Sequence, residues 1–414
     1  MPKLVLAYSG GLDTTTAITW LTKERGYDVV ALNIDVGMSR EQAVLEERGL
    51  AAGAARVIVE DAREDFLRYF AFPALAAGAL YQDAYPLATA LARPLMAKLL
   101  VDVAHDEGAV AVAHGCTGKG NDQVRFDVGI RTLDPALAIV APTREEAMSR
   151  EAEIEYLQEH DIAIAWEVKG SFSIDENIWG RSVEAGVLED PWTAPPPDAY
   201  VWTIAPEDAP AEGVDVEVGF EEGFPTTIDG EALDPVTLVE RLNDLGGQHG
   251  VGRVDHIEDR LVGIKSREIY EAPAATILFA AHRALETMTL SRQQQRLKRQ
   301  LSAEYAELIY DGLWFSAHHQ DLAAYTASTQ RFVSGDVRLR LHRGAVTVTG
   351  RRAESSLYDR ALATYDREDA FDHASAVGFI DIWGLQTRVQ ARQQLLDQLP
   401  QALRIARPGE GTSQ

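Results

Sequence analysis

Residues 7–15 read AYSGGLDTT and join an apolar run to a segment with helical periodicity. The run at 4–7 predicts a strand, and Ala17, Ile18 and Leu21 share one face of the helix that follows. Two adjacent glycines lack Cβ atoms, so the backbone of this turn can approach an anion closely. The first N–H groups of the helix and its dipole add to the attraction. The stretch therefore predicts a phosphate-binding turn, and the alternative is an ordinary strand-to-helix turn.

Side chains of the same turn add binding groups. Ser9 and Thr14 offer hydroxyl donors, and we expect Asp13 either to cap the helix or to help hold a metal ion. No Gly-Lys-Ser/Thr sequence follows the glycines, so this is not a Walker A loop. The turn resembles the pyrophosphate-binding loop of the N-type ATP pyrophosphatases, which cleave ATP between the α- and β-phosphates. That resemblance implies AMP-forming chemistry and leaves the substrate open.

Length and composition bound the class of protein. A chain of 414 residues predicts two domains and an appendage. A formal net charge of −25 argues against a general nucleic-acid or anionic-membrane surface. Cys116 is the single cysteine, which excludes an internal disulfide and a multi-cysteine metal site. No leader pattern precedes the first strand and no apolar run reaches membrane-spanning length, so we expect a cytoplasmic protein.

The first part of the chain alternates strands and helices. Compact apolar runs predict parallel strands at 3–8, 28–34, 56–59, 109–113 and 138–141. Helical patterns cover 14–25, 40–48, 64–80, 92–106 and 145–160. This alternation predicts an α/β fold with a doubly wound parallel sheet and ligands at the carboxyl ends of its strands.

After residue 167 the pattern is that of an α+β domain. A proline-rich connector at 190–197 precedes alternating apolar residues at 214–220, which predict an antiparallel strand. Asp234-Pro235 predicts the start of a helix that ends at Gly246-Gly247, and Pro273 predicts the start of another.

A hairpin and a last helix complete the expected fold. The hairpin pairs 337–341 with 346–348, and the helix at 382–399 carries an apolar stripe. This helix is expected either to pack back or to cross to another subunit, and we favour the second. The predicted domains are a nucleotide-binding domain at 1–167, an α+β synthetase domain at 168–370, and a C-terminal oligomerisation helix and tail at 371–414.

The densest polar motif follows the fourth predicted strand. Residues 114–126 read HGCTGKGNDQVRF and include Thr117, Asn121, Asp122 and Arg125. Donors, acceptors and both charge signs in one loop suit a zwitterionic amino acid, with Arg for the carboxylate and Asp for the ammonium. The alternative is a glycine-rich surface loop with satisfied polar groups.

Three further stretches carry clustered polar residues. Residues 170–182 read GSFSIDENIWGRS, which by itself favours a helix capping sequence at 173–177. Residues 250–270 predict apolar strands that carry many charged residues. They indicate either part of a site or, as the alternative, a hairpin whose solvent face carries salt bridges. The third stretch comprises Tyr81, Tyr85, Thr89, Arg93 and Pro94. It predicts either a site or a helix break with half-buried tyrosines.

Five motifs in one order make the chain similar to the argininosuccinate synthase family over nearly its whole length. They are AYSGGLDT, YPLATALARP, HGCTGKGNDQVRF, SIDENIWGRS and HGVGRVDHIEDRLVGIKSREIYEAPA. That family condenses citrulline with aspartate in arginine biosynthesis, using ATP and Mg²⁺, through citrullyl-AMP. The resemblance implies these small-molecule substrates, Mg²⁺ held mainly through the ATP phosphates, and a homotetramer without nucleic-acid or membrane partners.

The resemblance also implies roles for residues at matching positions. The implied ATP site comprises Ala7, Tyr8, Ser9, Gly10, Gly11, Leu12, Asp13, Thr14, Thr15, Ile34 and Gly115. The implied aspartate contacts are Thr117, Asn121 and Asp122. The implied citrulline contacts are Tyr85, Ala90, Asn121, Arg125, Ser173, Ser182, Glu258 and Tyr270. Asp13, Asp122 and Arg125 are the predicted catalytic residues, and no protein ligand of a metal is predicted. Cys116 and Ile34 stand where the family usually has alanine.

The implied chemistry accounts for these residue types. A ureido oxygen is a poor leaving group until its attack on the α-phosphorus makes it part of AMP. Backbone N–H groups and Mg²⁺ stabilise the charge that grows on the departing pyrophosphate. We expect positioning, and no conventional general base, to supply most of the rate of the aspartate step. Asp122 would orient the amine and Arg125 a citrulline carboxylate.

Two other functions remain open from the residues. An amidation enzyme of the same superfamily needs ammonia, usually from a glutaminase with a nucleophilic cysteine, and no histidine partner for Cys116 is evident. A sensor that binds ATP and amino acids without turnover would keep the same polar positions. Sustained formation of AMP and pyrophosphate excludes the sensor, and dependence on citrulline excludes the amidation enzymes.

Overall fold

The computed structural model describes residues 1–37, 41–145, 148–162 and 172–395. It divides into two units, Met1–Leu357 and Tyr358–Gln414, each of which is described by itself. The predicted change of pattern at 167, and the end of the last predicted helix at 396–399, lie outside the described residues. None of the helices within these ranges is long and apolar enough to cross a membrane.

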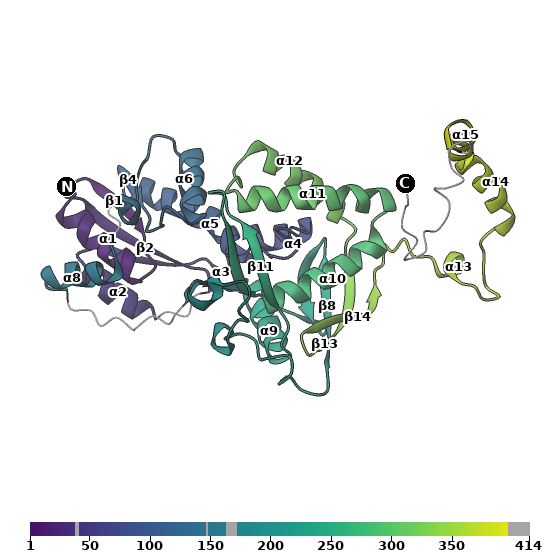
Figure 1. Ribbon diagram of the computed structural model, residues 1–414, viewed down its shortest axis with the longest axis horizontal. Helices are drawn as coiled ribbons and strands as arrows, with labels where there is room; N and C mark the ends of the chain where they lie inside the picture. The colour runs from purple at the N-terminus through teal and green to yellow at the C-terminus, as the bar shows by residue number, and fades with distance from the viewer. Residues whose placement is uncertain (38–40, 146–147, 163–171, 396–414) are drawn as a thin grey trace, which may run out of the picture. The chain divides into compact units, whose positions relative to one another are not determined.

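The first sheet is parallel and has the strand order β3-β2-β1-β4-β5. Figure 1 labels its strands β1, β2 and β4. Its strands are β1 (Lys3–Ala7), β2 (Asp28–Asp35), β3 (Arg56–Asp61), β4 (Ala111–Ala113) and β5 (Ala138–Val140). This order places two halves on either side of β1 and confirms the doubly wound α/β fold. All five predicted strands are present, and each differs from its predicted range by one or two residues at one end.

Helices cover both faces of this sheet because successive strand residues point to opposite sides. Leu4 and Leu6 of β1 pack with α1, whereas Val5 packs with α5. The helices that follow β1, β2 and β4 are α1 (Leu12–Lys23), α2 (Gln42–Ala51) and α6 (Asp122–Leu133), and the long helix α5 (Ala88–Asp106) precedes β4.

Two predicted helices are divided. The one at 64–80 consists of α3 (Arg63–Phe66), a π-helical turn (Leu67–Ala71) and α4 (Phe72–Ala77). The one at 145–160 is replaced by α7 (Pro142–Glu145) and α8 (Arg150–Glu159). Gly78, at φ 72°, follows α4, and its left-handed conformation is a common helix end.

The remainder of the first unit contains two further sheets. The five-stranded antiparallel sheet has the order β10-β9-β8-β13-β14, and the four-stranded one has the order β11-β12-β7-β6. The strands of the first are β8 (Val214–Glu221), β9 (Phe224–Ile228), β10 (Glu231–Ala232), β13 (Gly335–His342) and β14 (Ala345–Arg352). Those of the second are β6 (Ser173–Asn177), β7 (Gly180–Glu184), β11 (Arg253–Asp259) and β12 (Lys265–Glu271). The predicted strand at 214–220 and the predicted hairpin are confirmed.

Four helices belong to this α+β part. They are α9 (Pro235–Gln248), α10 (Pro273–Thr289), α11 (Arg292–Tyr310) and α12 (Ala317–Gln330), and two short 3₁₀ turns lie at Gly186–Glu189 and Pro197–Ala199. Asp234 caps α9 by accepting from Thr237 N at 3.0 Å, as predicted. The helix continues one residue past its predicted end at Gly246-Gly247, so both glycines are inside the last turn of α9.

Two other expectations are wrong. Ser173–Asn177 is a strand and not a helix cap, because it pairs with β7 in antiparallel register from Ser173↔Glu184 to Asn177↔Gly180. The last predicted helix starts too late: α14 (His373–Trp383) and α15 (Leu385–Gln390) divide at Gly384, after α13 (Arg360–Ala363), and a π-helical turn follows at Ala391–Leu395. The apolar residues of α14 lie on all sides of the helix and do not form one stripe, so the helical periodicity of the sequence did not predict this helix.

Candidate active site

The turn after β1 has the backbone geometry of an anion cradle. Gly10 adopts φ 72°, and Gly11 is the N-cap of α1. Gly11 has no side chain and the structure gives α1 no side-chain cap, so the first-turn N–H groups stay available. The expectation that Asp13 caps the helix is therefore wrong. Its carboxylate is in the first turn, one residue past the start of α1.

Hydroxyl groups fix the shape of this turn. Ser9 Oγ accepts a hydrogen bond from Gly11 N at 3.3 Å and lies 3.1 Å from Thr14 Oγ1. Thr15 Oγ1 donates to the Gly11 carbonyl at 2.7 Å. Arg48 Nη1 donates to the Gly10 carbonyl at 2.7 Å, which brings a positive charge from α2 to the turn.

The loop after β4 lies directly against the same turn. A Cβ atom added to Gly115 would come within 2.9 Å of Thr14 Cγ2. Such a separation is too short for a real Cβ contact, so glycine is what allows the close approach. Because β1 and β4 are neighbours in the sheet, the two glycine-containing loops meet at one edge.

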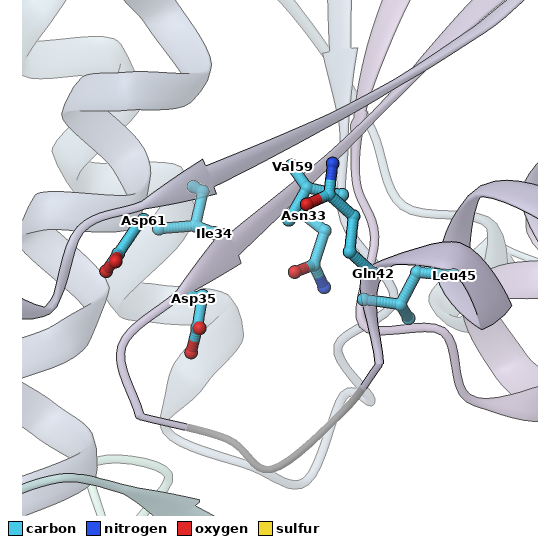
Figure 2. Close-up of a pocket in the computed structure, with 7 residues that line it drawn as sticks. All are labelled: Asn33, Ile34, Asp35, Gln42, Leu45, Val59 and Asp61. Atoms are coloured by element: carbon cyan, nitrogen blue, oxygen red, sulfur yellow. The ribbon is translucent and has the colours of Figure 1, made fainter.

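A pocket of about 190 Å³ lies at the carboxyl ends of β2 and β3 (Figure 2). Its lining comes from β2, β3 and α2 and comprises Asn33, Ile34, Asp35, Gln42, Leu45, Val59 and Asp61. Asn33 Nδ2 donates to the Tyr8 carbonyl at 2.8 Å, which ties the pocket to the turn after β1. Ile34 thus lines a pocket beside the predicted phosphate site.

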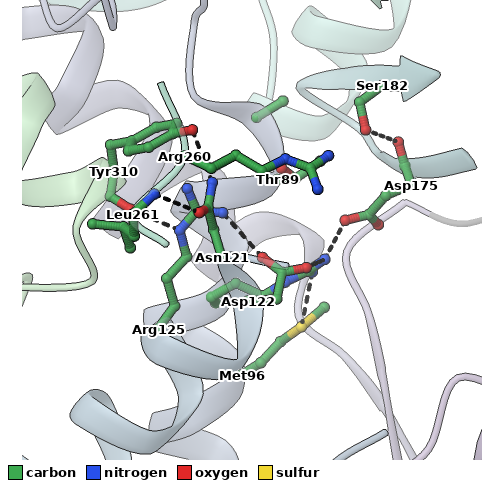
Figure 3. A network of polar contacts seen from close by, with 12 residues as sticks. Thr89, Met96, Asn121, Asp122, Arg125, Asp175, Ser182, Arg260, Leu261 and Tyr310 are labelled. Atoms are coloured by element: carbon green, nitrogen blue, oxygen red, sulfur yellow. Dashed lines mark hydrogen bonds and ion pairs between the residues drawn. The ribbon is translucent and has the colours of Figure 1, made fainter. Parts of the chain in front are cut away.

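A buried polar network begins at the first residue of α6 (Figure 3). The Asp122 carboxylate accepts from Arg93 Nη2 at 2.8 Å and from Arg125 Nη1 at 3.0 Å. The same Arg93 nitrogen donates to Asp175 of β6. Burial acts to raise the pKa of Asp122, but the two guanidinium groups outweigh it and lower this pKa to about 2. Burial, followed by the charge of Asp122, raises the pKa of Asp175 above its ordinary value.

The network continues through Asn121 to the far end of α11. Asn121 Nδ2 donates to the Tyr310 hydroxyl at 2.8 Å, and its Oδ1 accepts from Leu261 N at 2.9 Å. The Tyr310 hydroxyl donates to Glu258 Oε1 at 2.6 Å, and the Tyr270 hydroxyl donates to Glu258 Oε2 at 2.5 Å. Each oxygen of the buried Glu258 carboxylate therefore has a tyrosine donor.

Stacked tyrosines join the helix break after α4 to this network. The rings of Tyr85 and Tyr270 stack with centroids 4.0 Å apart, and those of Tyr81 and Tyr310 with centroids 3.6 Å apart. Tyr81 is 4% exposed and Tyr85 2% exposed, so the expectation of half-buried tyrosines is wrong. A break is present as predicted, with a β-bridge between Tyr81 and Tyr85.

The β11–β12 hairpin has two different faces. One carries Glu258 and Tyr270 into the network. The other carries an exposed ion pair between Lys265 and Asp259 at 2.5 Å, and a pair at 2.6 Å between the mostly buried Arg267 and the exposed Asp255. Alternate residues of a strand point to opposite sides. Both interpretations of this stretch therefore hold, on opposite faces of the hairpin.

The structure gathers most of the predicted substrate contacts. Those in or against the network are Tyr85, Asn121, Asp122, Arg125, Ser182, Glu258 and Tyr270. Ala90 is fully buried in α5, whereas Thr117 and Ser173 are exposed, and their side chains form no hydrogen bond to the network among the residues that the structure describes. Within the described ranges, no group of three or more His, Cys, Asp or Glu side chains is arranged to hold a metal ion.

Tyr310 is the member of the network that the sequence did not single out, because a tyrosine at the end of an amphipathic helix usually belongs to the core. Arg93 and Asp175 lie in stretches with clustered polar residues, but neither was given a role in the site. Arg125 also contacts Tyr310, with its Nε donating to the Tyr310 carbonyl at 2.9 Å.

Comparison with known proteins finds matches over nearly the whole chain. The family model described as "Arginosuccinate synthase N-terminal HUP domain" matches residues 3–163, and "Arginosuccinate synthase C-terminal domain" matches residues 172–390. Argininosuccinate synthase of Dehalococcoides mccartyi is 55% identical over 392 residues, covering 95% of this chain and 97% of that protein. Those of Symbiobacterium thermophilum and Geobacillus kaustophilus are each 53% identical, covering 95% and 94% of this chain and 98% and 96% of theirs. Because two family models together span nearly its full length, and its relatives are 53–55% identical over more than nine-tenths of the chain, the chain belongs to the argininosuccinate synthase family.

Proposed function

We propose that this protein ligates L-citrulline and L-aspartate in arginine biosynthesis, using ATP and forming argininosuccinate, AMP and diphosphate. The contact between Gly115 and Thr14 carries the proposal. It joins the turn after β1 to the loop that leads into α6, and α6 begins the polar network with Asp122. Phosphates held by the turn and amino acids held by the network would therefore be neighbours.

The residues present fit ATP. The uncapped N-terminus of α1, the left-handed Gly10 and the nearby Arg48 favour a polyphosphate. The pocket lined by Ile34 would receive the adenine ring. The Ile34 side chain, which is larger than the family's usual alanine, would form an apolar wall beside the ring. Mg²⁺ would be held mainly by the phosphates and would neutralise charge on the departing pyrophosphate.

Two unpaired guanidinium nitrogens favour anionic substrates in the network. Arg125 Nη2 and Arg93 Nε are buried and have no hydrogen-bond partner among the described residues. A buried cationic donor without a partner is costly, and a substrate carboxylate would satisfy it. We assign Asn121, Asp122 and Thr117 to aspartate. The citrulline contacts would be Tyr85, Ala90, Asn121, Arg125, Ser173, Ser182, Glu258 and Tyr270.

These residues would act by orientation and charge. The citrulline ureido oxygen attacks the α-phosphorus, and the N–H groups of the turn stabilise the pyrophosphate as its charge grows. Asp122, ionised at neutral pH, orients the incoming amine. Cys116 is a poor candidate for the nucleophilic cysteine of an amidation enzyme. Burial, followed by the charge of Asp122, raises the pKa of its thiol and so disfavours the reactive thiolate.

Pyrophosphate release tests the function. Purified protein with ATP and Mg²⁺ should release pyrophosphate only when citrulline is present, and should turn over continuously only when aspartate is added. Ammonia should not replace aspartate. Absence of release under every combination would reject the proposed reaction.

An Asp122→Asn variant tests the aspartate site. Loss of the negative charge should raise the aspartate KM about tenfold or more, because a charge-assisted hydrogen bond is worth about 1.5–3 kcal/mol. Asp215→Asn, at an exposed ion pair on β8, is the matched control. Normal turnover and an unchanged aspartate KM for Asp122→Asn would show that the assignment is wrong.

A further inference from the structure

One nitrogen atom holds two carboxylates together in the candidate active site. Arg93 Nη2 donates both to Asp122, at 2.8 Å, and to Asp175. The two acids come from α6 and β6, and Figure 3 shows both. Their side chains are 31% and 33% exposed. Both are thus open to a ligand while being tied to the same cation.

Asp175 lies where the two proposed amino-acid sites meet. It pairs with Ser182 across β6 and β7, and the Ser182 hydroxyl donates to the Asp175 carbonyl at 3.3 Å. Ser173 stands two residues before Asp175 on β6 and so points to the same side of the strand. The serines belong to the proposed citrulline site and Asp122 to the proposed aspartate site. With these assignments, the new C–N bond would form at this junction.

We propose that Asp175 is the general base that accepts a proton from the ammonium group of aspartate. The inference rests on the proposed ligase function and replaces the expectation that no such base is needed. Asp122 keeps the orienting role, and Arg93 holds both carboxylates in place.

The proposed step balances in atoms and charge. One N–H bond of the ammonium breaks, its proton passes to an Asp175 carboxylate oxygen, and the freed electron pair attacks the ureido carbon of citrullyl-AMP. The tetrahedral adduct then breaks its C–O bond and expels AMP. A second nitrogen proton leaves in this collapse and passes to the departing phosphate group, giving the guanidinium product.

The surroundings differentiate the two acids. The charged and titratable groups facing Asp175 are Arg93 on α5, Asp122 and Arg125 on α6, and Cys116 in the loop before α6. Burial and Asp122 raise the pKa of Asp175 despite the two arginines, whereas Asp122 is held at about 2. A pair of carboxylates separated in this way suits one fixed charge and one proton acceptor. A base whose pKa is nearer the working pH is also the more effective one.

Asp175→Asn separates the two half-reactions. In the full-length variant, citrulline-dependent exchange of pyrophosphate into ATP without aspartate should stay within about threefold of wild type. Turnover with saturating aspartate at pH 7 should fall about 100-fold or more, the usual effect of losing a general base. That turnover should then rise about tenfold per pH unit up to pH 9, as aspartate loses its proton unaided. Asp215→Asn is the control and should match wild type in both assays.

Other outcomes overturn the inference. Turnover within about threefold of wild type at pH 7 would show that no base is lost, and a loss that does not recover with pH would show a positioning role only. Loss of the exchange reaction would place Asp175 in adenylation. If Asp175→Asn does not fold, Asp175→Glu should turn over slowly and retain exchange, and full exchange with normal turnover would contradict the role. A wild-type protein inactive in both assays would instead reject the proposed function.

Discussion

The hydroxyl of Tyr310 donates to Glu258 Oε1 at 2.6 Å and thereby joins the end of α11 to β11. Tyr310 also accepts from Asn121, so it couples two proposed citrulline contacts. Tyr310→Phe would leave both partners without this hydroxyl inside a buried site. We expect the citrulline KM to rise about tenfold, which corresponds to about 1.4 kcal/mol.

Steady-state kinetics with citrulline varied would measure this effect. Tyr305→Phe is a matched control, because Tyr305 is a buried tyrosine on the same helix whose ring packs against Trp314 and His319. Equal citrulline KM values for Tyr310→Phe and wild type would show that this hydroxyl does not support the citrulline site.

Gly115→Ala tests the contact between the two loops. The added Cβ would meet Thr14 Cγ2 at 2.9 Å, so the turn or the loop must shift. Overpacking of this kind costs about 1–3 kcal/mol, and we expect it to appear as a rise of about tenfold in the ATP KM. Gly350→Ala is the control, because its Cβ would make only an ordinary 3.8 Å contact. An ATP KM unchanged in Gly115→Ala would argue against this loop as part of the nucleotide site.

We expect the free energy of unfolding to depend on pH through the buried His319. It is 5% exposed, and burial lowers its pKa from 6.5 to about 4. The folded state thus holds this imidazole neutral where the unfolded chain would protonate it. The stability that His319 contributes is complete above about pH 6.5 and is lost as the pH falls toward 4, by about 1.4 kcal/mol per unit.

Thermal unfolding of His319→Phe and wild type between pH 4 and 8 would measure this difference. The variant cannot titrate at this position, so the wild type should lose relative stability only below pH 6.5. The neighbouring His318, which is exposed, provides the control His318→Gln. Parallel curves for wild type and His319→Phe would contradict the prediction.

We propose that the second unit, Tyr358–Gln414, takes part in assembly and supports a homotetramer. Phe379, Ile380, Ile382 and Trp383 of α14 are each 60–77% exposed. Apolar surface of this kind is typical of a subunit interface. A chain that ends at Ala370 should elute from gel filtration at a smaller size than the full-length protein. Gln386→Ser, a polar change on α15, should leave the elution unchanged. An unaltered assembly size after truncation would remove the idea.

The sequence alone determined the features that depend on neighbours along the chain. Apolar runs predicted β1 to β5, and alternation predicted β8 and the β13–β14 hairpin, because burial of one face imposes its period on the residues. The glycine pair predicted the turn before α1, since few other residues adopt the φ of Gly10. Motifs in their order also predicted the family, which the comparisons confirm.

Only the tertiary structure decided which distant residues meet. Ser173–Asn177 has a local capping pattern, yet pairing with β7 makes it a strand, because several ladder hydrogen bonds outweigh one cap. Tyr310 reaches the site through the packing of α11 against α5, and no pattern near it in the sequence records that contact. Arg93 joins Asp122 and Asp175 across three separate elements. Local patterns specify which elements form, whereas partners for buried charges are chosen by three-dimensional proximity, which only the assembled fold defines.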